Sequence, residues 1–471
     1  MLQFFKVNDP FRLLGILLFV VLLRLPYIWL DMPLLQPEMI WMLIGERLVG
    51  DYAMYSQIMD DTGPLSALVY WALYSLFGRS LWAYHGVAGI IILFQVIYLN
   101  FLFIRFKSFQ ENSYLPAIVM LALFHLSYDF LILSPSLMGN TFILLAFGQL
   151  FSHTNINRNS TESVLLLGLY GGFALCFHFP LVVFFPFMVI CGVFISGFNF
   201  QQLSLSVTSY FIPVSMYAVY TFWTDSLGDF YREFVLASRQ VAQVVHVPYN
   251  EILILFAFPI ILSLIGLVLT FGLRKMYVNQ QKQSQLIVIY FICSCCAVFL
   301  ANRTITYQFL GLVPVFTYYL VHLLWVSKRK YKQRVIFYAY LLIIPLIGYG
   351  WLYLKKNEFE AFSSYAIIGK DRHQIQDGAR VLVLGKDLGY YQNAVPATPF
   401  INIGLAKQYL HDMEDYGKKT KVFRHFMEES PQFIIDEEGV FAQILPYFPQ
   451  LEQRYELVSD GIYQLKIPAN R

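Results

Sequence analysis

Charged side chains are scarce in this chain. Asp, Glu, Lys and Arg make up 13% of its 471 residues, whereas about 25% is typical of a soluble domain. This scarcity excludes a single water-soluble globular protein. The net charge is only +3, and no basic run of the kind that follows a nucleic-acid backbone occurs, so we expect no nucleic-acid partner.

Cysteine and nucleotide-binding motifs are also sparse. The chain has five cysteines, all in apolar stretches, and no disulfide framework follows from them. Cys293, Cys295 and Cys296 form a cluster, but no His or acidic residue stands at ligand spacing nearby. We therefore interpret them as small core residues. The C-terminal part has no GxGxxG sequence and no P-loop, so nucleotide binding is not supported.

Long apolar runs dominate what remains. Hydrophobic residues reach 58%, aromatic residues 18%, and the mean hydropathy is +0.55. Lipid must therefore be the solvent for much of the chain. The first run lacks a small-residue cleavage site, so we expect it to be retained. Runs of membrane length predict about eleven spans, near 11–30, 81–104, 114–133, 136–151, 163–178, 180–197, 205–223, 251–273, 285–300, 304–325 and 335–354.

A further apolar run at 64–78 is short for a span, which needs about 20 residues. Basic residues decide its position. If the N-terminus is cytoplasmic and 64–78 does not cross, the basic residues divide thirteen to five in favour of the cytoplasmic side, as the positive-inside rule requires. We therefore expect 64–78 to lie at the interface. The inner residues are Lys6, Arg12, Arg105, Lys107, Arg158, Arg274, Lys275, Lys282, Lys328, Arg329, Lys330, Lys332 and Arg334, and the outer ones are Arg47, Arg79, Arg232, Arg239 and Arg303.

This topology divides the chain into a transmembrane domain, 1–354, and an extracytoplasmic domain, 355–471, of ordinary soluble composition. It also places loops 31–80 and 224–250 on the outer side. Strands are expected at 381–384 and 433–436, a hairpin at 455–458 and 462–467, and helices near 402–412 and 418–429. The predicted fold class is a polytopic α-helical membrane protein of about eleven spans with a small C-terminal α/β domain. That domain is either a structural cap or a lid or acceptor platform over the outer face.

The first outer loop concentrates acidic residues. Apolar residues recur at helical spacing from Pro37 to Val49, and Pro37 suits the first turn of a helix. Glu38 is then expected in that first turn, near the positive end of the helix dipole. It is either a functional carboxylate or a surface acid that stabilises the helix terminus.

Asp60 and Asp61 precede Gly63 and Pro64 at the start of the second apolar run of this loop. Two adjacent acids at the membrane surface can bind a divalent cation or position a hydroxyl group. They can equally cap the helix that follows. Spacing alone leaves these alternatives open.

Two further candidates lie at the ends of spans. Arg303 stands at the mouth of a tight outer hairpin, where it can clamp a phosphate or extend to lipid headgroups. Asp129 lies near the outer end of the third span, and an acid at that depth is a functional candidate by default.

The order of these features resembles the GT-C glycosyltransferases of the protein mannosyltransferase and lipid A aminoarabinose transferase type. In that family a first span leads to a large outer loop with an Asp-Glu motif, two interfacial helices and an acid before Pro-Leu. The first loop matches this layout over about 40 residues of the chain, and further matches occur later. The segments are PEMIWMLIGERLVGDYAMYSQIMDDTGPLSALVYWALYSLFG, NRTITYQFLGLVP, VLVLG, PQFIID and YQLKI.

The resemblance implies an inverting glycosyltransferase in the cytoplasmic membrane. It would take a polyprenyl-phosphate-linked sugar and act on a protein, lipid or glycan acceptor at the outer face. Glu38 matches the Glu of the Asp-Glu pair, Asp60 or Asp61 the acid before Pro-Leu, and Arg303 and Tyr307 the residues that face the donor phosphate.

One departure concerns the family's general base. The Asp of the Asp-Glu pair aligns with Pro37, and Gln36 precedes it. Glu38, Asp60 or Asp61 would have to replace it. The alternatives are a catalytically inactive scaffold of the same fold, or a lipid or polysaccharide transporter. Against a transporter, we find no inverted repeat and few charges in the span centres.

Overall fold

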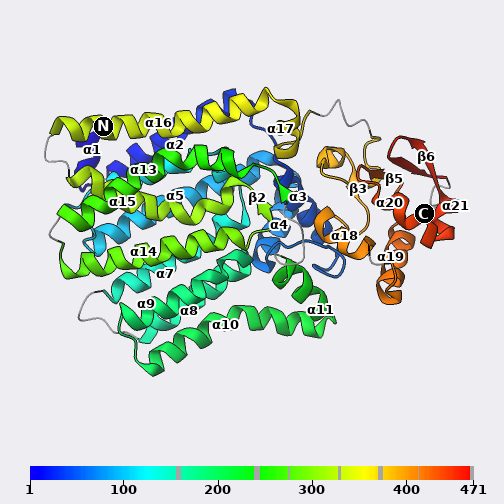
Figure 1. Cartoon of the computed structure of the whole chain (residues 1–471), viewed down its shortest axis with the longest axis horizontal. Helices are drawn as coiled ribbons and strands as arrows, with labels where there is room; N and C mark the ends of the chain where they lie inside the picture. The colour runs from blue at the N-terminus through cyan, green and yellow to red at the C-terminus, as the bar shows by residue number, and fades with distance from the viewer. Residues whose placement is uncertain are drawn as a thin grey trace. The chain divides into compact units, whose positions relative to one another are not determined.

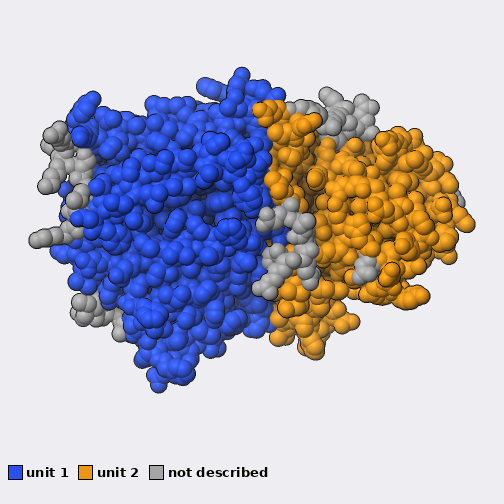
Figure 2. Space-filling model, in the orientation of Figure 1, with its two compact units in different colours: residues 1–32, 82–217, 247–357 blue, residues 33–81, 218–246, 358–471 orange. Residues whose placement is uncertain are grey.

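The computed structural model describes residues 1–154, 161–237, 244–273, 276–326, 330–369, 375–411 and 413–466. Two compact units are coloured separately in Figure 2. Unit 1 consists of Met1–Met32, Trp82–Tyr217 and Val247–Asn357, and unit 2 of Pro33–Leu81, Ala218–His246 and Glu358–Arg471. Six basic residues used in the charge count lie outside the described ranges: Arg158, Arg239, Arg274, Lys275, Lys328 and Arg329.

Unit 1 is helical, and its long helices run side by side (Figure 1). Short 3-10 segments join several of them, among them η1 (Tyr128–Leu131), η2 (Phe179–Val183) and η4 (Thr306–Leu312). The α-helices are α1 (Leu2–Lys6), α2 (Arg12–Trp29), α5 (Leu81–Arg105), α6 (Leu115–Phe124), α7 (Pro135–Ser152), α8 (Thr161–Phe177), α9 (Phe184–Phe194), α10 (Phe200–Trp223, whose last residues belong to unit 2), α13 (Tyr249–Leu273), α14 (Val278–Phe299), α15 (Val313–Val326) and α16 (Lys330–Lys356).

Within the described ranges, seven helices are long and apolar enough to cross a membrane, by length and composition. They are α2, α5, α10, α13, α14, the continuous η4–α15 segment and α16. Four shorter apolar helices accompany them: Pro64–Phe77, Leu115–Phe124, Thr161–Phe177 and Phe179–Phe194. The predicted multi-pass helical class is therefore confirmed, while the count of about eleven spans stays a prediction.

Small residues allow α8 and α10 to approach closely. A Cβ on Gly168 would lie 2.0 Å from the Ser209 hydroxyl oxygen, and one on Gly172 would lie 2.2 Å from the Tyr210 carbonyl oxygen. Close approach at glycines is how transmembrane helices gain van der Waals contact where no hydrophobic effect drives them together.

Unit 2 begins with the two helices expected in the first outer loop, α3 (Gln36–Val49) and α4 (Pro64–Phe77). They pack against each other through the stacked rings of Trp41 and Tyr70, whose centroids lie 5.7 Å apart. Gly45 lets the backbones meet, because a Cβ there would lie 2.6 Å from the Tyr70 carbonyl oxygen. With 14 residues, α4 is about 21 Å long, which is shorter than a hydrocarbon core of about 30 Å.

The C-terminal part of unit 2 is an α/β structure, as predicted. Its described strands form one five-stranded sheet in the order β4-β3-β5-β7-β6. Strand β3 pairs parallel with β4 and β5, and β7 pairs antiparallel with β5 and β6. The strands are β3 (Arg380–Leu384), β4 (Val395–Pro396), β5 (Phe433–Asp436), β6 (Tyr455–Ser459) and β7 (Ile462–Leu465), and the helices include α17 (Phe359–Tyr365), α18 (Ile403–His411), α19 (Tyr416–Glu429), α20 (Val440–Ile444) and α21 (Pro449–Arg454).

Loop 31–80 contributes to the core of this α/β structure. Leu382, Ile434, Phe426 and Phe441 form its centre, and Met59 from the loop is buried among them. The Met59 backbone N–H donates to the Pro399 carbonyl at 2.9 Å. The loop and the C-terminal segment therefore form one folded body, although more than 270 residues separate them in the sequence.

Candidate functional site

Glu38 occupies the first turn of α3, as the sequence predicted. Its side chain is buried rather than on the surface, and one carboxylate oxygen accepts a hydrogen bond from the Leu35 N–H at 3.1 Å. That N–H immediately precedes the helix and has no intrahelical acceptor. Glu38 therefore stabilises the start of α3 through a local contact.

Pro37, preceded by Gln36, stands at the position that corresponds to the Asp of the family's Asp-Glu pair. Pro37 is the second residue of α3, and the Gln36 amide makes two hydrogen bonds within unit 2. Its Nε2 donates to the Ser363 carbonyl at 3.1 Å, and its Oε1 accepts from the Leu388 N–H at 3.0 Å. The glutamine thus fastens α3 to the C-terminal segment and carries no group that could remove a proton.

Asp60 and Asp61 meet Asn402, which directly precedes α18. Asp60 is fully buried. It accepts from the Thr62 hydroxyl at 3.1 Å and from the Asn402 amide at 3.3 Å. The same amide lies 3.5 Å from a carboxylate oxygen of half-buried Asp61. Neither acid caps α4, whose N-cap residue is Gly63.

A metal at Asp60 and Asp61 would need more oxygen ligands than these two side chains supply, because Ca²⁺ takes 6–8 and Mg²⁺ about six. Within the described part of the chain, no group of three or more His, Cys, Asp or Glu side chains is arranged to hold an ion. Both oxygens of Asp60 already accept hydrogen bonds. The divalent cation remains a prediction.

Glu233 is a candidate site residue that the sequence did not reveal. It lies in a one-turn π-helix, Tyr231–Val235, and its side chain is 1% exposed. Asp229, Arg232, Asp60 and Lys421 all act on it electrostatically. π-turns occur frequently at functional sites. No residue pattern in loop 224–250 predicts one.

Burial raises the pKa of Glu233 well above its ordinary range, and the negative charge of Asp229 raises it further. The same surroundings raise the pKa of Tyr409, whose hydroxyl faces Glu233, chiefly through burial and then through the charge of Glu233. Acids with shifted pKa values in a cluster are candidates for proton transfer. Glu233 is therefore a candidate acid of unit 2, together with Asp60 and Asp61.

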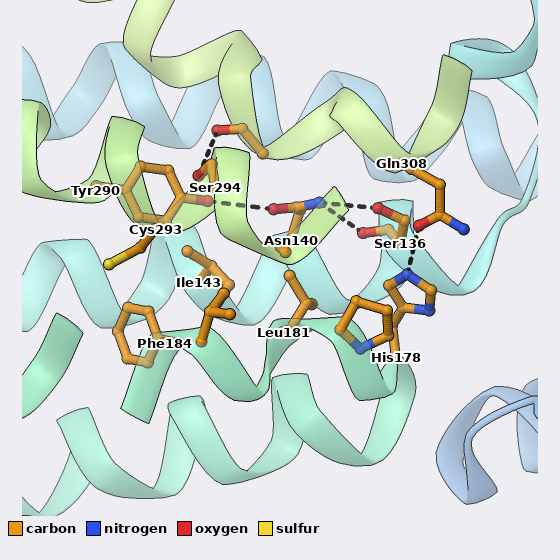
Figure 3. Close-up of a pocket in the computed structure, with 14 residues that line it drawn as sticks. Ser136, Asn140, Ile143, His178, Leu181, Phe184, Tyr290, Cys293, Ser294 and Gln308 are labelled. Carbon is orange, nitrogen blue, oxygen red and sulfur yellow. Dashed lines mark hydrogen bonds between the residues drawn. The ribbon is translucent and has the colours of Figure 1, made fainter. Parts of the chain in front are cut away.

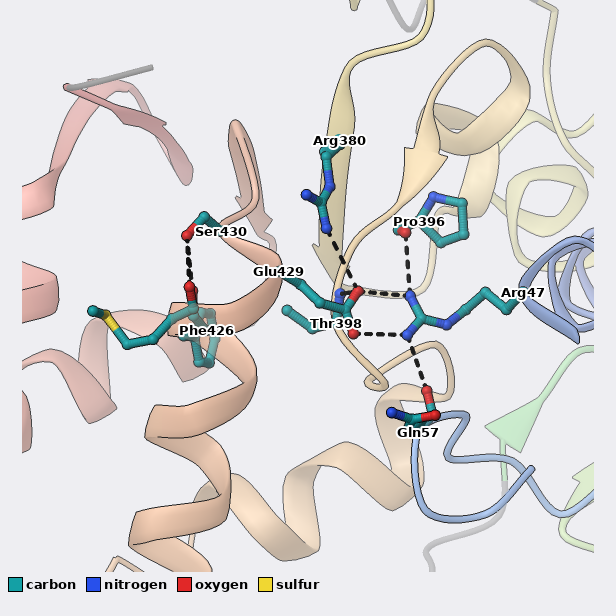
Figure 4. A network of polar contacts seen from close by, with 9 residues as sticks. Arg47, Gln57, Arg380, Pro396, Thr398, Phe426, Glu429 and Ser430 are labelled. Carbon is teal, nitrogen blue, oxygen red and sulfur yellow. Dashed lines mark hydrogen bonds and ion pairs between the residues drawn. The ribbon is translucent and has the colours of Figure 1, made fainter. Parts of the chain in front are cut away.

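A buried ion pair holds α3 to the α/β structure (Figure 4). The Arg47 guanidinium binds Glu429 through two hydrogen bonds of 2.7 and 2.9 Å. It also donates to the carbonyls of Pro396 and Gln57, while Glu429 accepts from the Thr398 N–H at 2.8 Å. Two-pronged arginine–carboxylate pairs fix geometry as well as charge. The network fixes the loop that carries Asp60 and Asp61.

A second arginine reinforces this arrangement. Arg79, which follows α4, forms an ion pair with Glu46 of α3 and donates to the backbone carbonyls of Tyr391 and Ala394. Arginines therefore link both helices of loop 31–80, α3 and α4, to the C-terminal segment.

In unit 1, Arg303 and Tyr307 are buried in one short segment, with Arg303 in β2 (Arg303–Thr304) and Tyr307 in η4. The Asp129 carboxylate accepts hydrogen bonds from the Thr306 N–H, at 3.1 Å, and from the Thr306 hydroxyl. Ser127 adds a hydrogen bond of 2.8 Å to the same hydroxyl. Asp129 thus fixes the segment between Arg303 and Tyr307, and burial argues against an arginine that extends to headgroups.

A small pocket with a mainly apolar lining and a few hydrogen-bonded polar side chains adjoins this segment (Figure 3). The Asn140 amide lies between Tyr290 and Ser136, with hydrogen bonds to both, and His178 contacts Gln308 at 2.7 Å. Its volume of about 10 Å³ suffices for one water molecule, which needs roughly 10–15 Å³. The pocket as it stands is too small for a sugar. Its hydrogen bonds join α14 to α7, and η4 to α14 and to the turn at His178.

The structure therefore distributes the predicted residues over both units. Glu38, Asp60 and Asp61 belong to unit 2, and Asp129, Arg303 and Tyr307 belong to unit 1. Asp60 and Asp61 share Asn402, and Asp129 supports the segment of Arg303 and Tyr307.

Sequence profiles of known families do not match the chain, and no curated protein matches it. Solved structures do. ArnT from Cupriavidus metallidurans, whose crystal structure contains undecaprenyl phosphate, aligns with a TM-score of 0.59 and 9% identity over 97% of this chain and 98% of ArnT. An oligosaccharyltransferase from Archaeoglobus fulgidus, in the apo form, aligns with a TM-score of 0.51 and 9% identity over 95% of this chain and 73% of that protein.

Both of these proteins are GT-C glycosyltransferases. The likeness to ArnT covers nearly the whole of both chains, so it includes the apolar helices, loop 31–80 and the C-terminal α/β structure. The fold that the resemblance implied is therefore confirmed, and the chain has the GT-C fold.

Proposed function

We propose that this chain is a membrane glycosyltransferase that moves a sugar from a polyprenyl-phosphate donor to an acceptor hydroxyl at the outer face of the cytoplasmic membrane. The observation that carries the proposal is the alignment over almost the full length of both chains with ArnT, a protein solved with undecaprenyl phosphate bound. Low identity limits that likeness to the fold, so the residues of this chain must support the chemistry.

The donor phosphate is assigned to Arg303 and Tyr307. A guanidinium matches the geometry of phosphate oxygens and keeps its charge at any physiological pH. Arg303 is buried beside a backbone that Asp129 fixes through Thr306. A fixed cation stabilises the charge that develops on the phosphate as the sugar leaves, because its position costs no rearrangement during the reaction.

The acceptor base is assigned to Asp61. Glu38 is buried and holds the Leu35 N–H, and Asp60 is buried and holds Thr62 and Asn402, whereas Asp61 is half-buried. The acceptor oxygen attacks the anomeric carbon, its proton passes to Asp61, and the bond from that carbon to the phosphate oxygen breaks with inversion. Asp60 then serves as a positioning residue for its neighbour.

The extracytoplasmic location of 355–471 and its role as a lid or acceptor platform belong to the same proposal. The Arg47–Glu429 pair and the Arg79 contacts support a C-terminal segment that stays attached to the first outer loop. A segment attached in this way would shield an acceptor beside Asp61 from water.

The second candidate function is a catalytically silent scaffold with the same fold. Pro37 stands where the family has its acid, and the amide of Gln36 is engaged by Ser363 and Leu388. If Asp61 does not act as the base in place of the family's Asp, the chain keeps the fold and lacks the reaction.

Variants at the assigned residues decide between the two. A strain that lacks the gene would be complemented with Asp61→Asn, Asp60→Asn, Glu38→Gln or Arg303→Gln, and its envelope glycans and glycolipids compared by mass spectrometry. We expect Asp61→Asn and Arg303→Gln to abolish the product that the null strain lacks. Glu452→Gln, at an exposed acid of α21, is the matched control.

If all four variants restore the glycan profile of the wild type, the glycosyltransferase proposal is wrong and the scaffold is supported. If only Asp60→Asn or Glu38→Gln abolishes the product, the reaction stands and the base is reassigned.

A further inference from the structure

Unit 1 contains a cavity of about 120 Å³ that neither the predicted residues nor the proposed reaction uses. It lies between α2, α5 and η1, and its lining includes Arg24, Tyr27, His85, Gly86 and Tyr128. One water molecule needs roughly 10–15 Å³, so the space admits a group far larger than water.

A guanidinium with spare hydrogen-bonding capacity faces this cavity. Arg24 lies inside α2, and its Nη1 donates to the His85 carbonyl at 3.1 Å. Its Nη2 is buried and has no hydrogen-bond partner, and in the described ranges no acidic side chain forms an ion pair with it. An arginine within a transmembrane segment is costly unless a partner offsets its charge. Among the residues that the structure describes, the His85 carbonyl is the hydrogen-bond acceptor for this guanidinium.

Helix α5 is shaped to receive that guanidinium. A Cβ on Gly89 would lie 3.1 Å from Arg24 Nη1 and 3.2 Å from Nη2, so the glycine makes room for the side chain. One turn earlier, Gly86 lines the cavity, and a Cβ there would meet no atom within 4 Å. The empty space therefore lies directly beside the charged group.

The rim of the cavity is apolar and exposed. Trp82 is 65% exposed and Ile28 is 42% exposed, and both line the cavity. Exposed apolar residues continue along the outer surfaces of the two helices, at Val21 on α2 and Ile90 on α5. Such a surface contacts acyl chains, and tryptophan favours the level of the headgroups. A ligand that enters from lipid is therefore amphipathic.

We propose that this cavity binds the phosphate group of an anionic phospholipid, with its acyl chains along α2 and α5. A guanidinium with a free N–H is suited to phosphate oxygens. The single positive charge of Arg24 matches the single negative charge of a phosphodiester. A lipid phosphate monoester carries about 1.5 to 2 negative charges at pH 7, so part of its charge would stay uncompensated in a medium of low dielectric constant. This proposal is independent of the glycosyltransferase reaction.

Native mass spectrometry of the full-length protein in detergent tests it. The probes are phosphatidylglycerol, phosphatidylcholine and a polyprenyl monophosphate. Arg24→Gln removes the charge, and Gly86→Leu fills the cavity while leaving Arg24 unchanged. Arg105→Gln, at the exposed far end of α5, is the control. We expect wild type and Arg105→Gln to retain phosphatidylglycerol about tenfold more tightly than phosphatidylcholine, and both cavity variants to lose this preference.

Size-exclusion profiles establish that the variants are folded. If Arg24→Gln is not monodisperse, Gly86→Leu alone decides. Retention of phosphatidylglycerol by Gly86→Leu at the affinity of wild type would overturn the site. Binding of the polyprenyl monophosphate that depends on Arg24 and exceeds that of phosphatidylglycerol would overturn the assignment to a phosphodiester. Loss of glycan product in any variant bears on neither result, because the measured quantity is lipid binding.

Discussion

The carboxylate of Asp129 accepts two hydrogen bonds from Thr306, a residue 177 positions later in the chain. One comes from the backbone N–H and the other from the hydroxyl. The contact joins the 3-10 turn after α6 to the segment that carries Arg303 and Tyr307. An acid at the end of a span was expected to be functional, and the geometry supports a positioning role for it.

Removal of the Asp129 carboxylate should therefore weaken binding of the lipid-phosphate donor more than it slows the chemical step. Asp129→Ala leaves the buried Thr306 N–H without its acceptor, which costs about 1–3 kcal/mol, and should release the segment of Arg303. We expect a KM for the lipid-phosphate donor raised at least about tenfold, a difference of about 1.4 kcal/mol, with a smaller change in kcat. Asp129→Asn retains an acceptor oxygen and should recover part of the loss. An unchanged KM in Asp129→Ala would show that the segment does not depend on Asp129.

The Arg47–Glu429 pair should carry much of the stability of unit 2. Removal of one partner of a buried pair leaves an uncompensated charge and costs about 3–5 kcal/mol. We expect Arg47→Ala and Glu429→Ala each to lower the unfolding temperature strongly, and the double variant to cost less than the sum of the two. Arg380→Gln is the matched control, because Arg380 is 41% exposed and lies 3.9 Å from Glu429. If Arg380→Gln lowered the unfolding temperature as much as Arg47→Ala and Glu429→Ala, the buried Arg47–Glu429 pair would not be the main source of this stability.

Glu233 should make stability depend on pH. Its folded-state pKa lies well above the ordinary value of 4.5 because of burial and then Asp229. Between those two pKa values the unfolded chain binds fewer protons than the folded chain, so stability falls as pH rises, by up to about 1.4 kcal/mol per pH unit. Glu233→Gln should flatten this slope in thermal unfolding measured from pH 5 upward, whereas Glu452→Gln should not. If stability falls equally steeply with pH in wild type and in Glu233→Gln, the raised pKa of Glu233 is refuted.

Reporter fusions test the predicted topology. With 64–78 at the interface, a reporter joined after residue 80 should be extracytoplasmic and one joined after residue 110 cytoplasmic. Alkaline phosphatase, which is active only outside the cytoplasm, and a fluorescent protein that folds inside it give opposite readouts at each position. Cytoplasmic fluorescence at the first position would make α4 a span.

Local patterns predicted much of the architecture. Strand β5 begins and ends at the predicted residues Phe433 and Asp436, and β3 begins one residue earlier than predicted. The helix that starts near Pro37 was also predicted, because its periodicity and first-turn residues agree. These elements have short-range signals that do not depend on what packs against them.

The contacts that define the candidate site were not predictable in this way. Asp60 meets Asn402 across 342 positions of sequence, and no local pattern encodes such a pairing. Glu233 lies in a turn without apolar periodicity, so its burial is set by tertiary packing. Arg24 is different, because a charged residue inside the first apolar run was visible in the sequence and is a signal of function.

The separation of Arg47 from Glu429 has a consequence for biogenesis. The two partners lie 382 positions apart, and chains are synthesised at about 5–20 residues per second. Arg47 therefore leaves the ribosome roughly 20 seconds or more before its carboxylate exists. Loop 31–80 therefore stays incompletely folded until the end of the chain has been synthesised. A premature stop before residue 429 would remove the carboxylate that pairs with Arg47 and leave the loop exposed to proteolytic quality control.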